Sequence, residues 1–485
     1  MNIFLFHRDL RLADNTTLIH QIKEMENVIP IFIFTPEQIN PKKNSYFSNN
    51  SVQFMIESLH ELSEEIKKKE GKMYFFKGDT MQVLKSLNKI NIIESIGFNI
   101  DYTPYAKKRD EEIKDWCDKK NIICYMKEDY PLYDILNGQT NKIDGTPYLV
   151  FTPFRNYCMK NLQVREVNKF KKFKFSKLKE LEELKYYMNE NEIDDFYEIN
   201  ENINVHGGRS NGLKILKNIG DFKNYQKNRD TLIYKTTFLG AHNHFSTVSI
   251  REEYHAMLDN LGKESGLINE LHWRDFYMNT VHNFPEVLNG QIGKKNKSLK
   301  IKYDNIKWEN NMKLFEHWKT ATTGFPLIDA SIRQLLQSGF VHNRMRMVSG
   351  SFVVKILLID WRYAEKFYAS HLVDYDTMVN NLSWQWVAGS GNDAQPYFRY
   401  FNTWTQSQKY DKNAEYIKKW IPELKEVPAI DLHNWWKKEI HEKWLNNGIK
   451  YYKPIVDHSE QRIKSLKIYK DGLNYTFFTE KWDTN

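Results

Sequence analysis

Two tryptophans, Trp384 and Trp386, stand one residue apart in the stretch NNLSWQWVAGSGNDAQPYFRYFN at residues 380–402. A core helix spaces its large residues three or four apart, and a half-buried strand does not crowd in residues such as Gly389 and Gly391. The stretch is therefore unsuited to plain packing. Large planar side chains beside amides and small residues are typical of a site that stacks on an aromatic ligand.

A second stretch, NELHWRDFY at residues 269–277, combines a carboxylate with an aromatic plate. On a helix, Glu270, Trp273 and Arg274 share one face by the i, i+3, i+4 rule, and Tyr277 follows one turn later. One interpretation is a local salt bridge with packing around it. The other is a carboxylate and an indole presented together to a planar ligand.

Two further stretches carry polar groups that suit nucleotide chemistry. HNRMRM at residues 342–347 alternates arginine and methionine, which fits either a surface that meets bases and phosphates or the start of an amphipathic helix. In VDYDTMVNNLSWQW, at residues 373–386, short carboxylates and amides lie close to the tryptophans. That pattern indicates hydrogen bonding to a heteroaromatic ring or a polar turn between two helices.

Several classes of function are excluded by what the sequence lacks. It has no H-E-x-x-H, no G-x-S-x-G and no Walker loop, and its 15 histidines show no metal-ligand spacing, so we expect no metal. The three cysteines form no C-x-x-C pair. A net charge of +8 permits a polyanionic partner. The apolar run at the start is too short for a signal peptide, and no segment reaches 18 apolar residues, which predicts an intracellular, soluble protein without a membrane partner.

Residues 1–130 alternate strand and helix patterns, which predicts a doubly wound parallel sheet. The predicted strands are residues 2–6, 28–34, 73–76 and 121–126, and the clearest helices are 51–69 and 105–120. No G-x-G-x-x-G follows the first strand, so a nucleotide is expected elsewhere. Residues 131–205 lack a clear period and predict a long connector. Residues 206–475 read as helical almost throughout, for example at 323–339 and 343–360, and 476–485 form a short tail. The predicted fold class is α/β plus all-α.

The order of these motifs resembles the photolyase/cryptochrome family along nearly the whole chain. The resemblance rests on FHRDLRLADN (6–15), YLVFTPFRN (148–156), NELHWRDFY, TGFPLIDASIRQL (323–335), HNRMRM, LIDWR (358–362), DYD (374–376), NNLSWQW and PYFRYFNTWTQSQKYD (396–411). It implies that the helical domain binds FAD.

The resemblance also implies roles for individual residues. Asn380 aligns with the residue that faces flavin N5, and Arg346 is similar to the arginine that pairs with the first aspartate of the acidic pair. The remaining implied flavin contacts are Tyr225, Thr236, Thr237, Phe238, Leu239, Gly240, Asp374 and Asp376. Trp384, Trp361 and Trp308 are similar to the inner, middle and surface members of an electron-transfer chain.

The partner implied by the resemblance is UV-damaged DNA, bound by a monomer. Trp273 and Trp386 align with the two aromatic walls of a pocket for a flipped-out lesion. Glu270 and Met347 complete that pocket, and residues that fall where the family touches DNA are Arg229, Arg274, Tyr277, Asn343, Arg344, Arg399 and Gln406.

The implied activity is light-driven repair of cyclobutane pyrimidine dimers. The alternatives are a cryptochrome-type photoreceptor, a (6-4) photoproduct enzyme and a single-strand-preferring relative. His342 is followed by Asn343 where (6-4) enzymes carry two histidines, which favours the cyclobutane class. Gly240 and Ser246 depart from the family's usual Ser and Gly. Thr103 stands where folate-using relatives have Glu, which counts against a folate antenna; a deazaflavin, a folate or no antenna at all stays open.

Overall fold

The computed structural model describes residues 1–179, 184–393 and 398–474. The chain forms two compact units. Unit 1 comprises Met1–Gln226, Thr236–Lys294 and Val373–Val379, and unit 2 comprises Lys227–Lys235, Lys295–Leu372 and Asn380–Asn485. These divisions differ from the predicted boundaries at residues 130 and 205, which stay a prediction. The predicted tail, 476–485, lies outside the described residues.

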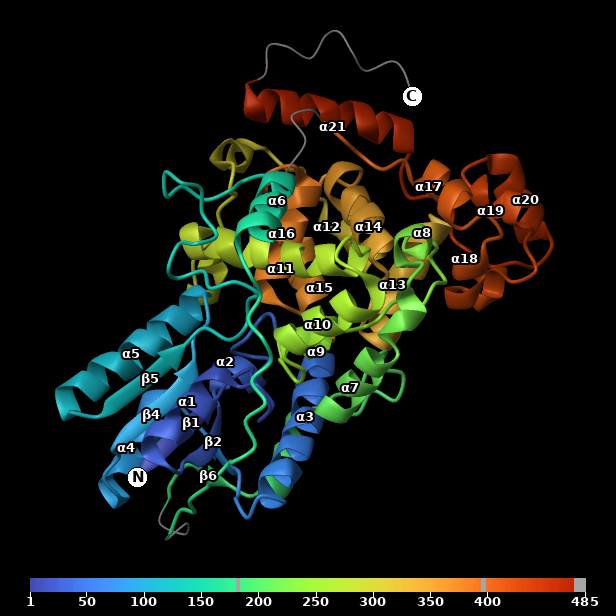
Figure 1. The fold of residues 1–485 in the computed structure, drawn as a ribbon. Helices are drawn as coiled ribbons and strands as arrows, with labels where there is room; N and C mark the ends of the chain where they lie inside the picture. Colours follow the sequence, from blue (N-terminus) through green and yellow to red (C-terminus); the bar gives the residue numbers. More distant parts are fainter. Residues whose placement is uncertain (180–183, 394–397, 475–485) are drawn as a thin grey trace. The chain divides into compact units, whose positions relative to one another are not determined.

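Unit 1 contains a six-stranded sheet in the order β5-β4-β1-β2-β3-β6 (Figure 1). Its strands are β1 (Asn2–Phe6), β2 (Ile29–Phe34), β3 (Tyr74–Lys77), β4 (Ser95–Asn99), β5 (Ile123–Lys127) and β6 (Tyr187–Met188). The first five pair in parallel, as predicted, and β6 pairs antiparallel with β3. The sequence analysis missed β4, whose residues SIGFN lack an apolar run, and the two-residue β6.

Strands β1, β2 and β4 are buried on both faces because helices cover each side. Phe4, Phe6 and Phe32 belong to one core cluster, with α1 (Thr16–Met25) and α3 (Asn49–Lys67). Their strand neighbours, such as Ile3 and Leu5, belong to a second cluster, with α4 (Thr80–Ile90) and α5 (Pro104–Lys120). This alternation follows from the two-residue period of a strand and confirms the doubly wound arrangement.

The rest of unit 1 consists of helices and irregular segments. The predicted connector contains α6 (Phe151–Asn161) and the 3-10 helix η2 (Glu190–Phe196) as well as β6. The other helical elements of unit 1 are α2 (Pro36–Ile39), α7 (Arg209–Lys217), η3 (Ile219–Phe222), α8 (Tyr225–Asn228, which continues into unit 2), α9 (Gly240–His244), α10 (Ile250–Leu261), α11 (Gly266–Asn283) and η4 (Pro285–Ile292).

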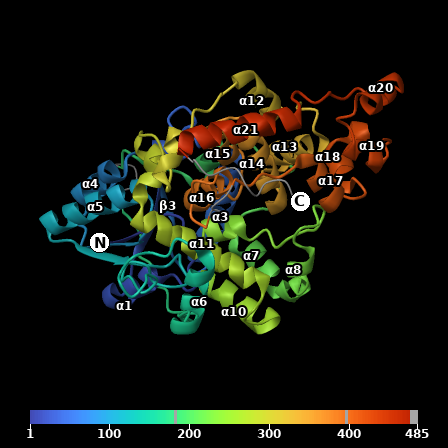
Figure 2. The same ribbon diagram turned by 90° about the horizontal axis from the view of Figure 1, so that it is seen from above.

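The described part of unit 2 is helical, as predicted (Figure 2). Its helices are η5 (Ile301–Asn305), α12 (Met312–Lys319), α13 (Pro326–Ser338), α14 (Asn343–Lys355), α15 (Trp361–Ala369), α16 (Thr377–Ala388, whose first turn belongs to unit 1), α17 (Thr403–Tyr410), α18 (Glu415–Trp420), η6 (Pro422–Leu424), α19 (Ala429–His433), α20 (Lys438–Asn446) and α21 (His458–Leu473). Across the described ranges, no helix is both long and apolar enough to span a bilayer.

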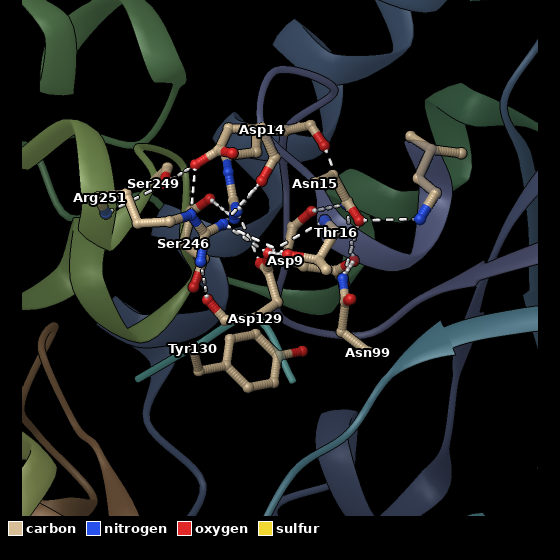
Figure 3. A network of polar contacts seen from close by, with 12 residues as sticks. Asp9, Asp14, Asn15, Thr16, Asn99, Asp129, Tyr130, Ser246, Ser249 and Arg251 are labelled. Carbon is tan, nitrogen blue, oxygen red and sulfur yellow. Dashed lines mark hydrogen bonds and ion pairs between the residues drawn. The ribbon is translucent and has the colours of Figure 1, made fainter. Parts of the chain in front are cut away.

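A buried set of charges, here the Arg251 network, holds the carboxyl end of the sheet to α10 (Figure 3). Arg251 donates to Asp14 Oδ2 at 2.6 Å and to Asp129 Oδ1 at 2.7 Å, and Arg11 donates to Asp129 Oδ2 at 2.6 Å. Ser249, the N-cap of α10, donates to Asp14. Both arginines and both carboxylates are buried, so each charge depends on its partners for solvation.

Amides extend the Arg251 network to the strand ends. The Asp9 carboxylate accepts from Asn15 Nδ2 at 2.9 Å and from Asn99 Nδ2 at 2.7 Å, and Asn99 ends β4. Ser246, which accepts from Arg11 through its carbonyl, has a φ of 45°. A left-handed φ favours glycine, and a serine costs roughly 1 kcal/mol in that conformation.

We expect Arg251→Met to lower the free energy of unfolding by roughly 3–5 kcal/mol, because two buried carboxylates lose a partner. Burial would raise the pKa of Asp129, but Arg11 and Arg251 outweigh it and the pKa is lowered. Because the pKa of Asp129 is lowered in the folded state, its ion pairs contribute fully to the free energy of unfolding above about pH 4. This contribution is lost as the pH falls further. The difference in the free energy of unfolding between Arg251→Met and the intact chain should therefore be smaller at acidic pH.

Urea unfolding at pH 7 and at pH 3 measures both effects. Arg155→Met is the matched control, since Arg155 pairs with the exposed Glu264 at 2.8 Å and its loss should cost at most about 1 kcal/mol. Equal costs for the two variants would show that the Arg251 network does not stabilise unit 1.

Candidate functional site

Unit 1 has a cavity of about 340 Å³ at the carboxyl ends of β1, β2 and β4. The strand order changes direction here, because β1 lies between β2 and β4, and open parallel sheets bind ligands at such a switch point. We call this cavity the switch-point pocket. Its wall combines aromatic and charged side chains, among them Phe6, His7, Arg8, Tyr46, Asp101, Tyr105, Arg109, His244, Tyr375 and Asp376.

Asp376 and Arg8 set the charge of the switch-point pocket. Arg8 lies 3.3 Å from Asp376 Oδ2 and 2.8 Å from Asp101 Oδ2, and His244 Nδ1 lies 3.3 Å from Asp376. Burial would raise the pKa of Asp376, but the His244 hydrogen bond and the charges of Arg8 and Arg274 lower it. The Asp376 carboxylate also accepts from Met378 N and Val379 N, which caps α16. The predicted flavin ligand Asp376 thus has a structural role as well.

Aromatic rings give the switch-point pocket flat surfaces. Tyr46 and Tyr375 stack with their ring centroids 6.3 Å apart and 14° between planes. Thr103 caps α5 by accepting from Ala106 N at 3.3 Å. The pocket can therefore hold a planar, polar-edged molecule, and Thr103 adds no carboxylate to it.

The predicted phosphate-binding run Thr236–Gly240 forms a strained turn in unit 1. Phe238 has a φ of 55°, which is a true outlier for a bulky residue and is typical of a functional turn. A Cβ at Gly240 would lie 2.9 Å from Asp374 Oδ2 and 3.1 Å from Asp374 Cβ. This close approach explains glycine at residue 240, and it brings the run together with Asp374 as the flavin prediction requires. Tyr225 donates to Glu270 Oε1 at 3.4 Å in the same unit.

Helix α11 places the predicted lesion residues Glu270 and Trp273, both of them half-buried. Trp273 stacks face to face on Phe151 of α6, at 3.8 Å and 7°. Phe151 covers one face of the indole and fixes its plane, so a ligand can stack only on the other face. The sequence analysis missed this supporting role, because Phe151 lies in the predicted connector.

Two other α11 residues lie elsewhere than expected. Arg274 is only 8% exposed and donates to the carbonyls of Tyr130, at 2.7 Å, and Asn243. Tyr277 is also buried, beside Trp273. The helix turns both side chains into unit 1, and the direct DNA contacts of Arg274 and Tyr277 stay a prediction.

Helix α16 separates the two tryptophans that stand one residue apart. Trp384 is 4% exposed and Trp386 is half-buried, because positions i and i+2 lie on different faces of a helix. The polar turn considered for this stretch is a helix instead. One indole can thus serve the interior of unit 2 while the other meets a ligand.

Asn380 and Asn381 give α16 a polar face. Asn380 Nδ2 lies 3.2 Å from the carbonyl of Glu365, which leaves its amide oxygen as the acceptor. The Asn381 Nδ2 atom is buried, and among the residues that the structure describes no acceptor lies within its reach. The amide oxygen of Asn380 could accept from a donor on the edge of a flavin ring.

The aromatic neighbours of Trp384 include a residue that the sequence analysis missed. The centroid of the Trp384 ring lies 5.1 Å from that of Tyr368 and 6.5 Å from that of Trp318, and both of these residues are buried. Trp361 is buried as well, with Arg362 4.6 Å from its ring, and Trp308 is half-buried against Tyr469. Trp308 is the least buried of the three, but Trp361 is at least as buried as Trp384, so burial does not separate the inner from the middle member and the electron-transfer chain stays a prediction. Spacing alone gave no signal for Trp318, which reads as a core residue.

The first turn of α14 carries the other predicted lesion contacts in unit 2. Asn343 is exposed and Met347, one turn later, is half-buried. His342 precedes them as the N-cap and accepts from Arg344 N at 3.2 Å. Burial lowers the pKa of His342 to about 4, so the ring is neutral at neutral pH.

The predicted basic contacts of unit 2 differ in how they are engaged. Arg344 pairs with Asp230 at 2.7 Å and lies 4.0 Å from the Tyr410 ring, next to Gln406 on α17. Arg346 donates to the carbonyl of Val341 at 2.8 Å. Arg399 is exposed. A phosphate would reach Arg399 directly, whereas at Arg344 it would compete with Asp230.

No group of His, Cys, Asp and Glu side chains suited to a metal ion occurs among the described residues.

Comparison with known proteins gives a consistent identification. Residues 2–174 match the family described as DNA photolyase, and residues 267–471 match the FAD binding domain of DNA photolyase.

The chain therefore belongs to the DNA photolyase family, and its helical region is an FAD-binding domain of that family. A deoxyribodipyrimidine photo-lyase of Buchnera aphidicola (subspecies Baizongia pistaciae) is 33% identical over 97% of this chain and 98% of its own.

Two solved structures are similar over nearly the whole chain. An archaeal photolyase from Sulfolobus tokodaii, described with two FAD molecules and a novel light-harvesting cofactor, is 36% identical with a TM-score of 0.84, covering 97% of this chain and 100% of its own. A cryptochrome from Synechocystis is 25% identical with a TM-score of 0.84, covering 96% and 99%.

The two tasks of Asp376, ion pairing and helix capping, can be separated by mutation. Asp376→Asn should keep the cap and lose the charge, which costs roughly 1.5–3 kcal/mol because Arg8 and His244 lose a charged partner. Asp376→Ala should cost about 1 kcal/mol more, since the cap is lost as well. Urea unfolding at pH 7 measures both, and identical values for the two variants would mean that the cap contributes nothing.

Proposed function

We propose that this chain repairs cyclobutane pyrimidine dimers in UV-damaged DNA, driven by blue light. The observation that supports it most directly is α16, which turns Trp384 inward and leaves Trp386 partly exposed to stack on two linked bases. Family membership along nearly the whole chain agrees with this function.

The residues that hold FAD in this proposal are Tyr225, Thr236, Thr237, Phe238, Leu239, Gly240, Arg346, Asp374, Asp376 and Asn380. When bound in its fully reduced form, FAD supplies one electron to the lesion on absorbing light and takes it back after the ring has split. Asn380 offers its amide oxygen to a protonated ring nitrogen and carries no charge. A carboxylate at residue 380 would instead repel an anionic ring.

The lesion is bound by stacking and by hydrogen bonds. Extruding two linked bases costs a few kcal/mol, and contacts with Trp273, Trp386 and Met347 would offset that cost. Glu270, in its protonated form, would donate a hydrogen bond to the carbonyl region of the dimer and stabilise its developing charge. The exposed Arg399, with Arg229, Asn343, Arg344 and Gln406, contacts the DNA strand, so binding weakens with salt.

His342 supports cyclobutane dimers over (6-4) products. A (6-4) product requires proton transfer during repair, which needs a group that titrates near neutral pH. His342 is neutral, and its Nδ1 atom is used as a helix cap. Asn343 beside it cannot donate a titrating proton.

The pre-reduced enzyme should repair cyclobutane thymine dimers under blue light and leave (6-4) products intact. Glu270→Ala should keep FAD bound and lower the repair yield roughly tenfold or more, because a hydrogen bond to the charged intermediate of the dimer is lost. Repair is measured by chromatography of matched duplexes that carry one lesion each.

Trp384→Phe is the matched control in this assay. Trp384, Trp361 and Trp308 would conduct an electron inward only when the flavin starts oxidised, so the pre-reduced variant should repair normally. Repair of (6-4) products would contradict the lesion assignment. Absence of light-dependent repair of either lesion would contradict the enzyme proposal and favour a cryptochrome-type photoreceptor.

The switch-point pocket supports a second chromophore in unit 1. Its stacked tyrosines suit a planar ring, and Arg8, Arg109 and Lys43 suit a phosphate or another anionic group. The description of the Sulfolobus tokodaii protein, with two FAD molecules, favours a flavin or deazaflavin here over a folate. The chromophore would act as an antenna that passes excitation to the catalytic flavin.

We expect a titration with FAD, FMN or a deazaflavin to give one bound molecule beyond the catalytic FAD. Tyr375→Ala should weaken this second binding step at least fivefold, since one stacking ring is lost, while the catalytic FAD is retained. Fluorescence titration measures the stoichiometry. Failure of all three compounds to bind would leave the switch-point pocket without an antenna role.

A further inference from the structure

Residues 434–453 form a projection of unit 2, here called the aromatic arm, that carries exposed aromatic and basic side chains. In this segment of 20 residues there are three tryptophans, two tyrosines, five lysines and two glutamates. Helix α20, at its centre, buries none of its residues. Figures 1 and 2 both show α19 and α20 next to α17 and α18.

The base of the aromatic arm is fixed on both sides. On the incoming side, His433 Nδ1 is 2.8 Å from Ser407 Oγ of α17 and His433 Nε2 is 3.1 Å from the carbonyl of Lys412. On the outgoing side, Tyr451 donates to Asp329 of α13 at 2.5 Å. A Cβ at Gly324 would lie 2.1 Å from the Lys453 carbonyl oxygen, so only glycine allows this approach. The aromatic arm is therefore an ordered projection whose two ends are both anchored to unit 2.

The aromatic arm contains two aromatic dipeptides, Trp435-Trp436 and Tyr451-Tyr452, and in each of them the first ring is buried and the second is exposed. Trp435 and Tyr451 are buried and lie 5.6 Å apart, and Trp435 Nε1 donates to the Tyr452 carbonyl at 2.9 Å. The residue that follows each buried ring points outward: Trp436 is 54% exposed and Tyr452 is 48% exposed. The buried pair thus fastens together two chain segments, each of which presents an aromatic ring to solvent.

Lysines accompany both exposed rings. Lys437 and Lys438 follow Trp436, and Lys450 and Lys453 flank Tyr452. Lys437 Nζ lies 5.5 Å from the Trp436 ring, and Lys438, Lys450 and Lys453 are exposed. Aromatic rings that accept bases, interleaved with cations that accept phosphates, are what nucleic-acid strands meet on sequence-tolerant binding surfaces.

The aromatic arm is continuous with residues already assigned to DNA. Helix α17 carries Gln406, and its last residue, Tyr410, lies under the Arg344 guanidinium. The next residue after Gln406 is Ser407, which holds His433 at the base of the arm. A DNA strand that follows Arg344 and Gln406 outward therefore reaches the arm through α17.

We propose that the aromatic arm is a second contact surface for DNA, which binds the strand flanking the lesion through Trp436, Tyr452 and the four lysines beside them. This inference rests on the proposed function, because it takes the DNA from the repair site. The arm takes no part in the chemistry and adds affinity for long DNA only.

The test compares an arm variant, Trp436→Ala with Lys437→Gln and Lys438→Gln, with the intact FAD-loaded chain. All three positions lie at the surface of the arm, and urea unfolding checks that the variant folds. The matched control is Lys85→Gln with Lys89→Gln on α4, where two exposed lysines are lost from unit 1. The two DNA probes are a five-nucleotide strand with a central thymine dimer and a 24-base-pair duplex with the same lesion.

For the duplex, the arm variant should bind about tenfold more weakly at 0.1 M salt, with a salt slope lower in magnitude by about 1 to 2, because two phosphate contacts are lost. For the short strand, affinity and light-driven repair should be unchanged. The control variant should match the intact chain on both probes.

Unchanged duplex affinity in the arm variant would overturn the arm proposal while leaving the proposed function intact. If the intact chain repairs neither probe, the proposed function itself fails. Weaker duplex binding accompanied by a loss of self-association in sedimentation would also overturn the proposal, since the arm would then bind a second copy of the chain.

Discussion

The solvation of charge at the carboxyl end of the sheet is the constraint on which unit 1 depends. Arg11, Arg251, Asp14 and Asp129 are removed from water, and each is stable there only because the others are in place. The same end of the sheet, where strand order reverses, forms the switch-point pocket. The Arg251 network extends to Asn99, the last residue of β4, so it also anchors a strand end beside the pocket.

Neighbouring side chains that point in different directions explain how single segments of this protein perform two tasks. On α16, Trp384 packs in the interior while Trp386 is half-buried, and in the aromatic arm Trp435 packs while Trp436 faces solvent. Asp376 similarly caps a helix and pairs with Arg8. Adjacent residues with different environments allow a site to be rigid on one side and open on the other.

Much of the fold and site could be predicted from the sequence, because apolar periodicity and ordered motifs are local signals. Strands β1, β2, β3 and β5 were marked by apolar runs, whereas β4 became a strand through its neighbours despite Gly97 and Asn99. The burial of Arg274 could not be predicted, since it depends on carbonyls from Tyr130 and Asn243 that lie far away in the sequence. Trp318 and Phe151 were missed because their importance lies in which ring they touch.

The short strand β6 has a consequence for the behaviour of the protein in a crowded cell. Strand β3, with the residues YFFK, would otherwise end the sheet with unpaired backbone groups beside a run of aromatic residues. Such an edge is a template on which a second chain can add, and short apolar strands of this kind initiate aggregates. Tyr187 and Met188 occupy that template with two residues. A segment that contributes little to the core thereby protects the folded chain from misassociation at its most vulnerable edge.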